Sequence, residues 1–165
     1  MKVKIIPLTW IIAPLVNREQ LERWHKAGFI DDEGLHLDRA FPRDSNGKPI
    51  IFRIWLRGAM NRALEKMKKA DRSVLDFRIV DEKGLPIDYI TINDKPLRYR
   101  RFINVGKKQT TEFFEYVDGT YTLSFLVETP KPKEFLEVLS IAGEIGLMSR
   151  TKHGFGKFKV EVEAK

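Results

Sequence analysis

Residues 143–163 read Gly-Glu-Ile-Gly-Leu-Met-Ser-Arg-Thr-Lys-His-Gly-Phe-Gly and then Lys-Phe-Lys-Val-Glu-Val-Glu. The second part alternates apolar and charged side chains over residues 157–163, which predicts a strand with one buried face. The first part holds four glycines among basic residues, which predicts a loop after a helix. Bare N–H groups beside Arg150, Lys152 and His153 suit a phosphate group, although a helix cap followed by a tight turn would also explain the glycines.

Five further segments of regular periodicity precede this stretch. Helical spacing of apolar residues marks two helices, and period-two alternation marks the strands. In chain order the predicted elements are a strand at 3–16 that Pro7 and Pro14 bend or end, a helix at 53–69, strands at 73–80 and 121–127, a helix at 133–147 and the strand at 157–163. This order predicts an α+β fold with a ferredoxin-like (RRM-like) βαββαβ core, whose helices cover one face of an antiparallel sheet.

Two insertions interrupt this predicted core, at about residues 17–50 and about residues 81–118, within a single domain of residues 1–165. In the first insertion, Asn17 and Gln20 form a capping box that predicts a short helix ending at Gly28. The residues that follow it show no sustained period up to Pro49, which predicts a long irregular segment. The second insertion interleaves aromatic and basic residues, a mixture that suits phosphate contact and base stacking.

The composition limits the partners of the chain. Thirty Lys and Arg residues against 23 Asp and Glu give a formal net charge of +7, which favours a polyanionic partner. The absence of cysteine excludes disulfides and thiolate metal sites, and abundant Lys and Glu are compatible with a thermophilic source. The apolar runs are too short for a signal peptide or a membrane span, so we expect a cytoplasmic protein with no membrane partner.

Basic and glycine residues in three places are the candidate nucleic-acid contacts: the first long helix, the second insertion and the glycine-rich loop. The candidates are Arg53, Arg57, Arg62, Arg98, Arg100, Arg101, Lys107, Lys108, Arg150, Lys152, His153, Gly154 and Gly156. Basic side chains of this kind neutralise RNA phosphates and release counterions. Ordinary solvated faces of the helix and of the insertion are the alternative explanation for the same charges.

Four segments in matching order resemble the RAMP superfamily of CRISPR-associated proteins, and within it the backbone subunit of type III effector complexes. They are residues 154–156 before the last strand, the helix start at 56–64, the segment 112–125 and the loop at 38–51. The resemblance implies an RNA-binding subunit that assembles with itself along a guide RNA in antiviral defence. It also implies target RNA and other CRISPR effector subunits as partners.

One departure from the family widens the interpretation. The family's Pro-Gly-Ser-Ser element is replaced by Phe-Arg-Ile-Trp at residues 52–55. The chain could therefore also be a diverged relative of the family. One such alternative is a mimic that is carried by a virus or mobile element and interacts with CRISPR complexes.

The same resemblance implies a catalytic residue. In the type III family, the aspartate that matches Asp38 cuts target RNA with the help of a divalent metal, Mg²⁺ or Mn²⁺. Asp38 is therefore the candidate catalytic and metal-binding residue of a metal-dependent endoribonuclease. Two alternatives stay open: a subunit that only binds RNA, and a stand-alone RAMP-type endoribonuclease in which His153, beside Arg150 and Lys152, acts as acid or base without a metal.

Overall fold

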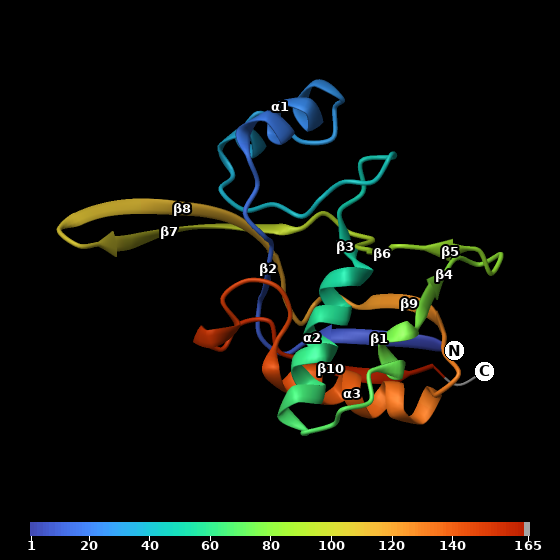
Figure 1. Ribbon diagram of the computed structural model, residues 1–165. Coiled ribbons are helices and arrows are strands. Elements are labelled where there is room, and N and C mark those ends of the chain that lie inside the picture. The colour runs from blue at the N-terminus through green and yellow to red at the C-terminus, as the bar shows by residue number, and fades with distance from the viewer. Residues whose placement is uncertain (164–165) are drawn as a thin grey trace.

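Two helices cover one face of a five-stranded antiparallel sheet in the computed structural model of the chain, which describes residues 1–163 (Figure 1). The strands lie in the order β10-β1-β9-β4-β5. The strand bounds are β1 Lys2–Pro7, β4 Arg78–Val80, β5 Pro86–Ile87, β9 Leu123–Glu128 and β10 Phe158–Val162, and the helices are α2 Arg53–Lys66 and α3 Pro132–Ile145. The predicted α+β class is confirmed.

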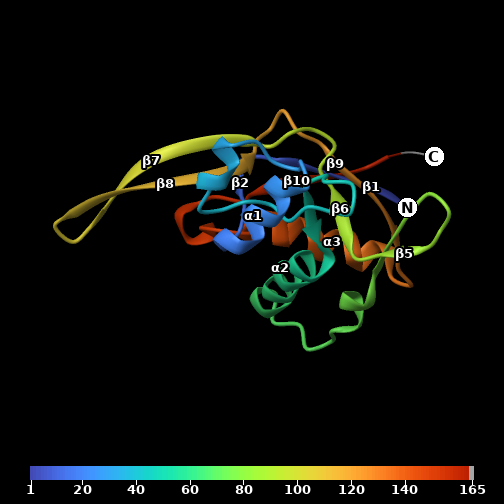
Figure 2. The same cartoon turned by 90° about the horizontal axis from the view of Figure 1, so that it is seen from above.

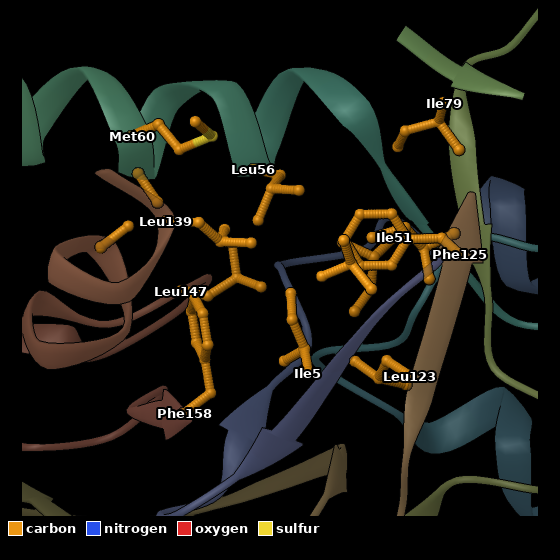
Figure 3. Close-up of a cluster of buried hydrophobic side chains, with 14 of the residues drawn as sticks. Ile5, Ile51, Leu56, Met60, Ile79, Leu123, Phe125, Leu139, Leu147 and Phe158 are labelled. Carbon is orange, nitrogen blue, oxygen red and sulfur yellow. The ribbon is translucent and has the colours of Figure 1, made fainter. Parts of the chain in front are cut away.

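The main apolar core lies between this sheet and the two helices (Figure 3). Alternation along β1 turns Val3 and Ile5 inward, and Leu123 of β9 and Phe158 of β10 share that face. The helices contribute Leu56, Met60, Phe135 and Leu139, all fully buried. Burying one such side chain contributes about 1.5–3 kcal/mol. This layer is therefore the scaffold that carries the insertions.

The glycine-rich segment lets α3 pack closely against the last strand. A Cβ atom at Gly143 would lie 2.3 Å from the backbone oxygen of Phe158, so only glycine permits this approach. Pro132 occupies the first turn of α3, where a missing N–H costs nothing, and the helix is capped by Gly146 with φ of +117°. The predicted succession of helix, loop and strand is confirmed.

The first insertion packs as a small layer of its own. After β2 (Ile11–Ile12), the helix α1 (Arg18–Lys26) begins at Asn17, whose side chain accepts the N–H of Gln20 at 2.8 Å, as the capping box predicts. A 3₁₀ turn, η1 (Glu33–His36), follows in the irregular segment. A second apolar cluster joins them to Phe113: Leu21, Trp24, Ile30, Leu37, Ala40 and Phe113.

The second insertion forms a long two-stranded arm. Strands β7 (Leu97–Val105) and β8 (Lys108–Val117) pair antiparallel from Leu97↔Tyr116 to Val105↔Lys108, and the end of β8 also pairs with β2. The arm projects well away from the main sheet (Figures 1 and 2). Before it, β3 (Ile50–Phe52) pairs with β6 (Tyr89–Thr91), and the pair contributes Ile51 and Ile90 to the main core.

One predicted strand is shorter than expected, and another ends at the first of its prolines. Ser73–Asp76 form a 3₁₀ turn, η2, and only Arg78–Val80 form a strand. Val74 and Leu75 are both buried, which a strand with one inward face does not permit for adjacent residues. The strand predicted at 3–16, which its prolines were expected to bend or end, ends at Pro7. Within residues 1–163, no helix combines the length and the apolar character needed to cross a membrane.

Candidate nucleic-acid interface

Three segments that are far apart in the sequence meet at the base of the arm. Arg101 of β7, Arg39 of the irregular segment and Arg150 of the glycine-rich loop all approach the carboxylate of Glu112 on β8. Arg150 Nη2 lies 2.5 Å and Arg39 Nε 3.5 Å from Glu112 Oε2, and Arg101 Nη2 lies 3.3 Å from Oε1. We call these four residues the arginine cluster. It joins both insertions to the loop that precedes β10.

The arginine cluster holds one negative charge among three positive ones. Glu112 is buried, and burial alone would raise its pKa. The hydrogen bond from Arg150 and the charges of Arg150, Arg39 and Arg101 outweigh that effect, so the pKa of Glu112 lies below its usual value. The arginine side chains are 15%, 26% and 24% exposed for Arg39, Arg101 and Arg150. The cluster is therefore partly desolvated but still open to a ligand.

Aromatic rings pack against one another beside the cluster, at the arm base. The rings of Trp10 and Tyr116 stack with centroids 4.0 Å apart, and Tyr99 meets Trp10 edge-on at 5.3 Å. Phe155 of the glycine-rich loop lies 6.3 Å from Trp10. Burial raises the pKa of the Tyr116 hydroxyl, helped by the nearby Asp118 carboxylate. Tyr99 remains 45% exposed, so it presents part of its ring at the surface.

The opposite face of the arm base is occupied by protein contacts. Side chains alternate along β7, so Arg98 and Arg100 point away from Arg101. Arg98 Nη1 lies 2.8 Å from Asp31 Oδ1, and this hydrogen bond lowers the pKa of Asp31. The Arg100 guanidinium lies 4.5 Å from the ring centroid of Phe113. Arg98 in particular ties the arm to the first insertion.

A buried ion pair also connects the arm to the first insertion. Arg43 reaches both carboxylate oxygens of Glu115, with Nη1 2.9 Å from Oε1 and Nη2 2.7 Å from Oε2. Glu115 Oε1 also accepts the backbone N–H of Phe41 at 3.0 Å. The two side chains are 4% and 1% exposed. A buried charge pair with this many hydrogen bonds fixes how the irregular segment lies on β8.

The tip of the arm is free of such contacts in the described residues. Phe102 is 72% exposed and Val105 63% exposed, and Lys107 and Lys108 are exposed at the turn. Gly106 supplies the positive φ that the turn needs. Of the predicted contacts in the second insertion, Lys107 and Lys108 are thus the ones exposed at the tip.

The glycine-rich loop is shaped by its own backbone. Gly156 donates its N–H to the backbone oxygen of Trp10 at 2.7 Å and accepts the N–H of Leu147 at 2.9 Å. Its φ is +83°, and a Cβ atom there would lie 2.2 Å from the backbone oxygen of Leu147. Gly154 also has a positive φ of +86°, but open space surrounds the position of its Cβ.

Between these glycines and α3, the loop presents basic side chains under backbone strain. Lys152 and His153 are exposed on the 3₁₀ turn η3 (Thr151–His153). Arg150 and Met148 adopt φ of +61° and +71°, although both carry a Cβ. Such left-handed conformations cost about 1–2 kcal/mol each and concentrate at functional sites.

The three arginines of α2 lie in different surroundings. Arg62 Nη2 donates to the backbone oxygen of Gly146 at 3.2 Å, so it borders the glycine-rich segment. The Arg53 guanidinium lies 5.1 Å from the ring centroid of Phe77, and the exposed Arg57 shares a shallow surface pocket with Arg53. None of the three belongs to the arginine cluster.

Asp38 lies directly beside the arginine cluster, on the first insertion. Its Oδ2 accepts the backbone N–H of Phe113 at 2.8 Å, and its own N–H donates to the backbone oxygen of Phe113 at 2.7 Å. Asp38 is otherwise exposed. The carboxylate therefore anchors the loop to β8 whether or not it has a chemical role.

The donor set around Asp38 does not by itself make a site for a divalent cation. Across residues 1–163, no group of three or more His, Asp or Glu side chains comes together in a way that could hold a metal. The next residue, Arg39, brings a positive charge, which disfavours a cation. The predicted Mg²⁺ or Mn²⁺ stays a prediction.

Sequence reasoning missed several residues that organise this surface. No sequence motif marks Arg39, Arg43 or Trp10, and only the fold brings them to the arm. Glu112 and Glu115 carried a signal: Glu112 directly precedes and Glu115 interrupts the apolar run Phe-Phe-Glu-Tyr-Val, within an otherwise basic hairpin. Acidic side chains in such a place are buried at a cost unless they are paired, which indicates internal ion pairs.

Comparison with known proteins gives a fold relationship. No protein-family model and no curated protein sequence matches the chain. Among solved structures, the chain is similar to one in "Cryo-EM structure of the Type III-B Cmr-beta bound to cognate target RNA", with a TM-score of 0.63 and 13% identity. The match covers 98% of this chain and 58% of that one, so the present chain spans less than two thirds of its length. The fold of this protein is thus related to that of a type III CRISPR complex subunit.

Proposed function

We propose that the protein is an RNA-binding subunit of a type III-related CRISPR effector ribonucleoprotein, and that it binds guide RNA and meets target RNA. The observation that carries the proposal is the junction at the arm base, where a projecting hairpin, a glycine-rich loop and three arginines meet. The related fold of a chain in a complex bound to target RNA supports it. Other CRISPR subunits and further copies of this chain are the expected protein partners, in the cytoplasm.

The core is best assigned as one ferredoxin-like RAMP domain that carries both insertions. Its elements run β1, α2, β4, β9, α3 and β10, and the strands lie β10-β1-β9-β4. Numbered within a βαββαβ unit, that spatial order is 4-1-3-2, with every neighbouring pair antiparallel. Helices on one face of the sheet support the same assignment.

The arm and the loops, rather than the sheet, form the RNA surface in this proposal. The outward residues of the central strands, such as Lys4 and Ile6 of β1 and Ser124 of β9, offer no aromatic ring on which bases could stack. At the outer part of the arm, by contrast, Phe102 presents an exposed ring, and Lys107 and Lys108 are exposed at the turn. A stacked base is worth about 1–3 kcal/mol. The tip would wedge between bases of the guide–target duplex while its lysines contact phosphates.

Cleavage of target RNA through Asp38 remains a separate proposal. Its support is the exposed carboxylate beside the arginine cluster. Asp38→Asn keeps an oxygen that accepts the Phe113 N–H but removes the charge, whereas Asp38→Ala removes both. If Asp38 is catalytic, both variants lose cleavage of complementary RNA while Asp38→Asn keeps its RNA affinity and melting temperature. Cleavage that survives in Asp38→Asn would exclude the role and leave His153 as the remaining candidate.

The RNA-binding proposal is tested by purifying the protein from cells without nuclease treatment. We expect RNA of discrete length to copurify, seen as a raised 260/280 nm absorbance ratio and a band that RNase removes. Protein that is free of nucleic acid, and that also fails to bind added single-stranded RNA at low salt, would contradict the proposal.

A further inference from the structure

We propose that Arg39, Arg101 and Arg150 form a phosphate-binding site in which Glu112 does not bind the ligand but holds the three guanidiniums together. The inference rests on the proposed function in one respect: the phosphate is taken to be a phosphodiester of RNA. The site itself follows from charge, burial and hydrogen-bonding capacity at the arm base.

The site carries more positive than negative charge. Glu112 is the only carboxylate within 4.0 Å of these three arginines in residues 1–163, so two positive charges are left without a partner. About three quarters or more of each arginine side chain is covered. Like charges held together in a partly desolvated place repel one another, and an anion relieves that repulsion.

Most N–H donors of the three guanidiniums are not used by the protein itself. Each guanidinium has five N–H donors, and its hydrogen bonds within residues 1–163 use few of them: Arg150 and Arg101 donate to Glu112, and Arg39 Nη1 donates to Ser149 Oγ at 2.9 Å. Among residues 1–163, the Nε atoms of all three arginines are buried without a hydrogen-bond partner, although Arg39 Nε lies at ion-pair distance, 3.5 Å, from Glu112 Oε2. A phosphate group brings several acceptor oxygens and matches the fork geometry of arginine.

The position of the site links phosphate binding to the direction of the arm. Its three arginines come from the first insertion, from β7 and from the strained loop at Arg150. A phosphate that bridges them would hold the arm in a fixed direction relative to the glycine-rich loop. Phosphate binding at the arm base and the orientation of the arm tip are therefore coupled.

The first experiment uses inorganic phosphate as the probe and thermal unfolding as the readout. Melting temperatures are compared in phosphate and in chloride at equal ionic strength for the wild type, Arg101→Gln, Glu112→Gln and Arg78→Gln. Arg78 is exposed on β4 and serves as the charge-matched control. At phosphate about fivefold above its dissociation constant, we expect a rise of about 2–4 °C in the wild type.

The variants separate a binding site from a purely structural cluster. Glu112→Gln leaves three unbalanced charges, so it should melt lower in chloride and gain more from phosphate than the wild type. Arg101→Gln should gain less than the wild type, and Arg78→Gln should gain equally. If Glu112→Gln does not fold, the comparison of Arg101→Gln with Arg78→Gln is sufficient to test the site. The same phosphate gain in both of these variants would overturn the site.

The second experiment asks whether the phosphate belongs to RNA. With single-stranded oligouridine, Arg101→Gln should bind about tenfold more weakly than Arg78→Gln, and its log–log salt slope should be smaller by about 0.7, one phosphate contact. Equal RNA binding by the two variants, with the phosphate effect intact, would overturn the RNA assignment but not the anion site. A wild type that gains from phosphate but does not bind RNA would refute the proposed function and the RNA source together, and leave the site standing.

Discussion

Replacing Gly156 by alanine should destabilise the fold far more than the same change at Gly154. The two residues lie in one loop and have nearly the same backbone conformation, with φ of +83° and +86°. A left-handed alanine costs about 1–2 kcal/mol, and lower entropy of the unfolded chain returns about 0.4–1 kcal/mol. Strain of the backbone alone therefore predicts a loss of about 1 kcal/mol at either position.

The surroundings of the two glycines differ. A Cβ at Gly154 meets nothing within 4 Å, whereas at Gly156 it would lie 2.2 Å from the oxygen and 2.7 Å from the nitrogen of Leu147. Both are backbone atoms, so no side chain can rotate away. The chain must shift, which costs about 1–3 kcal/mol and weakens the hydrogen bonds of Gly156 to Trp10 and Leu147 by about 1 kcal/mol.

Together these effects give a loss of about 3–5 kcal/mol for Gly156→Ala against about 1 kcal/mol for Gly154→Ala. For a chain of this size, 1 kcal/mol corresponds to about 2–4 °C in melting temperature. Circular dichroism melts of the two variants and the wild type, each also followed by urea titration, measure the difference. Equal losses in the two variants, or a Gly156→Ala protein as stable as the wild type, would refute the account of the loop as a packed turn.

Further changes test the ion pairs and the charge of the arm. Glu115→Gln should cost about 3–5 kcal/mol, because it leaves Arg43 buried without its counter-charge, and adding Arg43→Met should restore much of the lost stability in urea titrations. The pKa of Glu112 is lowered in the folded protein, so the stability that its charge contributes is present above about its usual value of 4.5 and is lost as pH falls through the lower, folded value. Melting temperature should therefore fall as pH is lowered from about 5 towards 3, and fall less steeply in Glu112→Gln; identical pH profiles would contradict this.

The spacing of apolar residues in the sequence was sufficient to predict the helices and the strand that pack regularly against one another. The helices α2 and α3 and the last strand follow from apolar spacing, and the start of α1 follows from Asn17 and Gln20. Periodicity failed where two adjacent residues are buried together, as at Val74 and Leu75, since a turn and a strand share that local composition. Local sequence carries no information on which neighbouring element will cover a residue.

The candidate site was predictable only in outline. Charge marked the arm and the glycine-rich loop, but counting basic residues could not separate Arg98, which is bound to Asp31, from Lys107 and Lys108, which are exposed. That distinction depends on the register of β7 on β8 and on what covers each face of the arm base. Arg39 reached the site only because its segment lies against Phe114 of β8, a contact between residues 75 positions apart.

If RNA binds along the arm and the glycine-rich loop, the affinity for single-stranded RNA must fall as the salt concentration rises. Fluorescence anisotropy with a labelled oligonucleotide should give a log–log slope of about −0.7 for each phosphate contacted, and a steep slope for the wild type. Lys107→Gln combined with Lys108→Gln should reduce the magnitude of that slope by up to about 1.4 without lowering the melting temperature, because both side chains are exposed at the tip. A wild-type affinity that does not change with salt, or a double variant indistinguishable from the wild type, would contradict the claim.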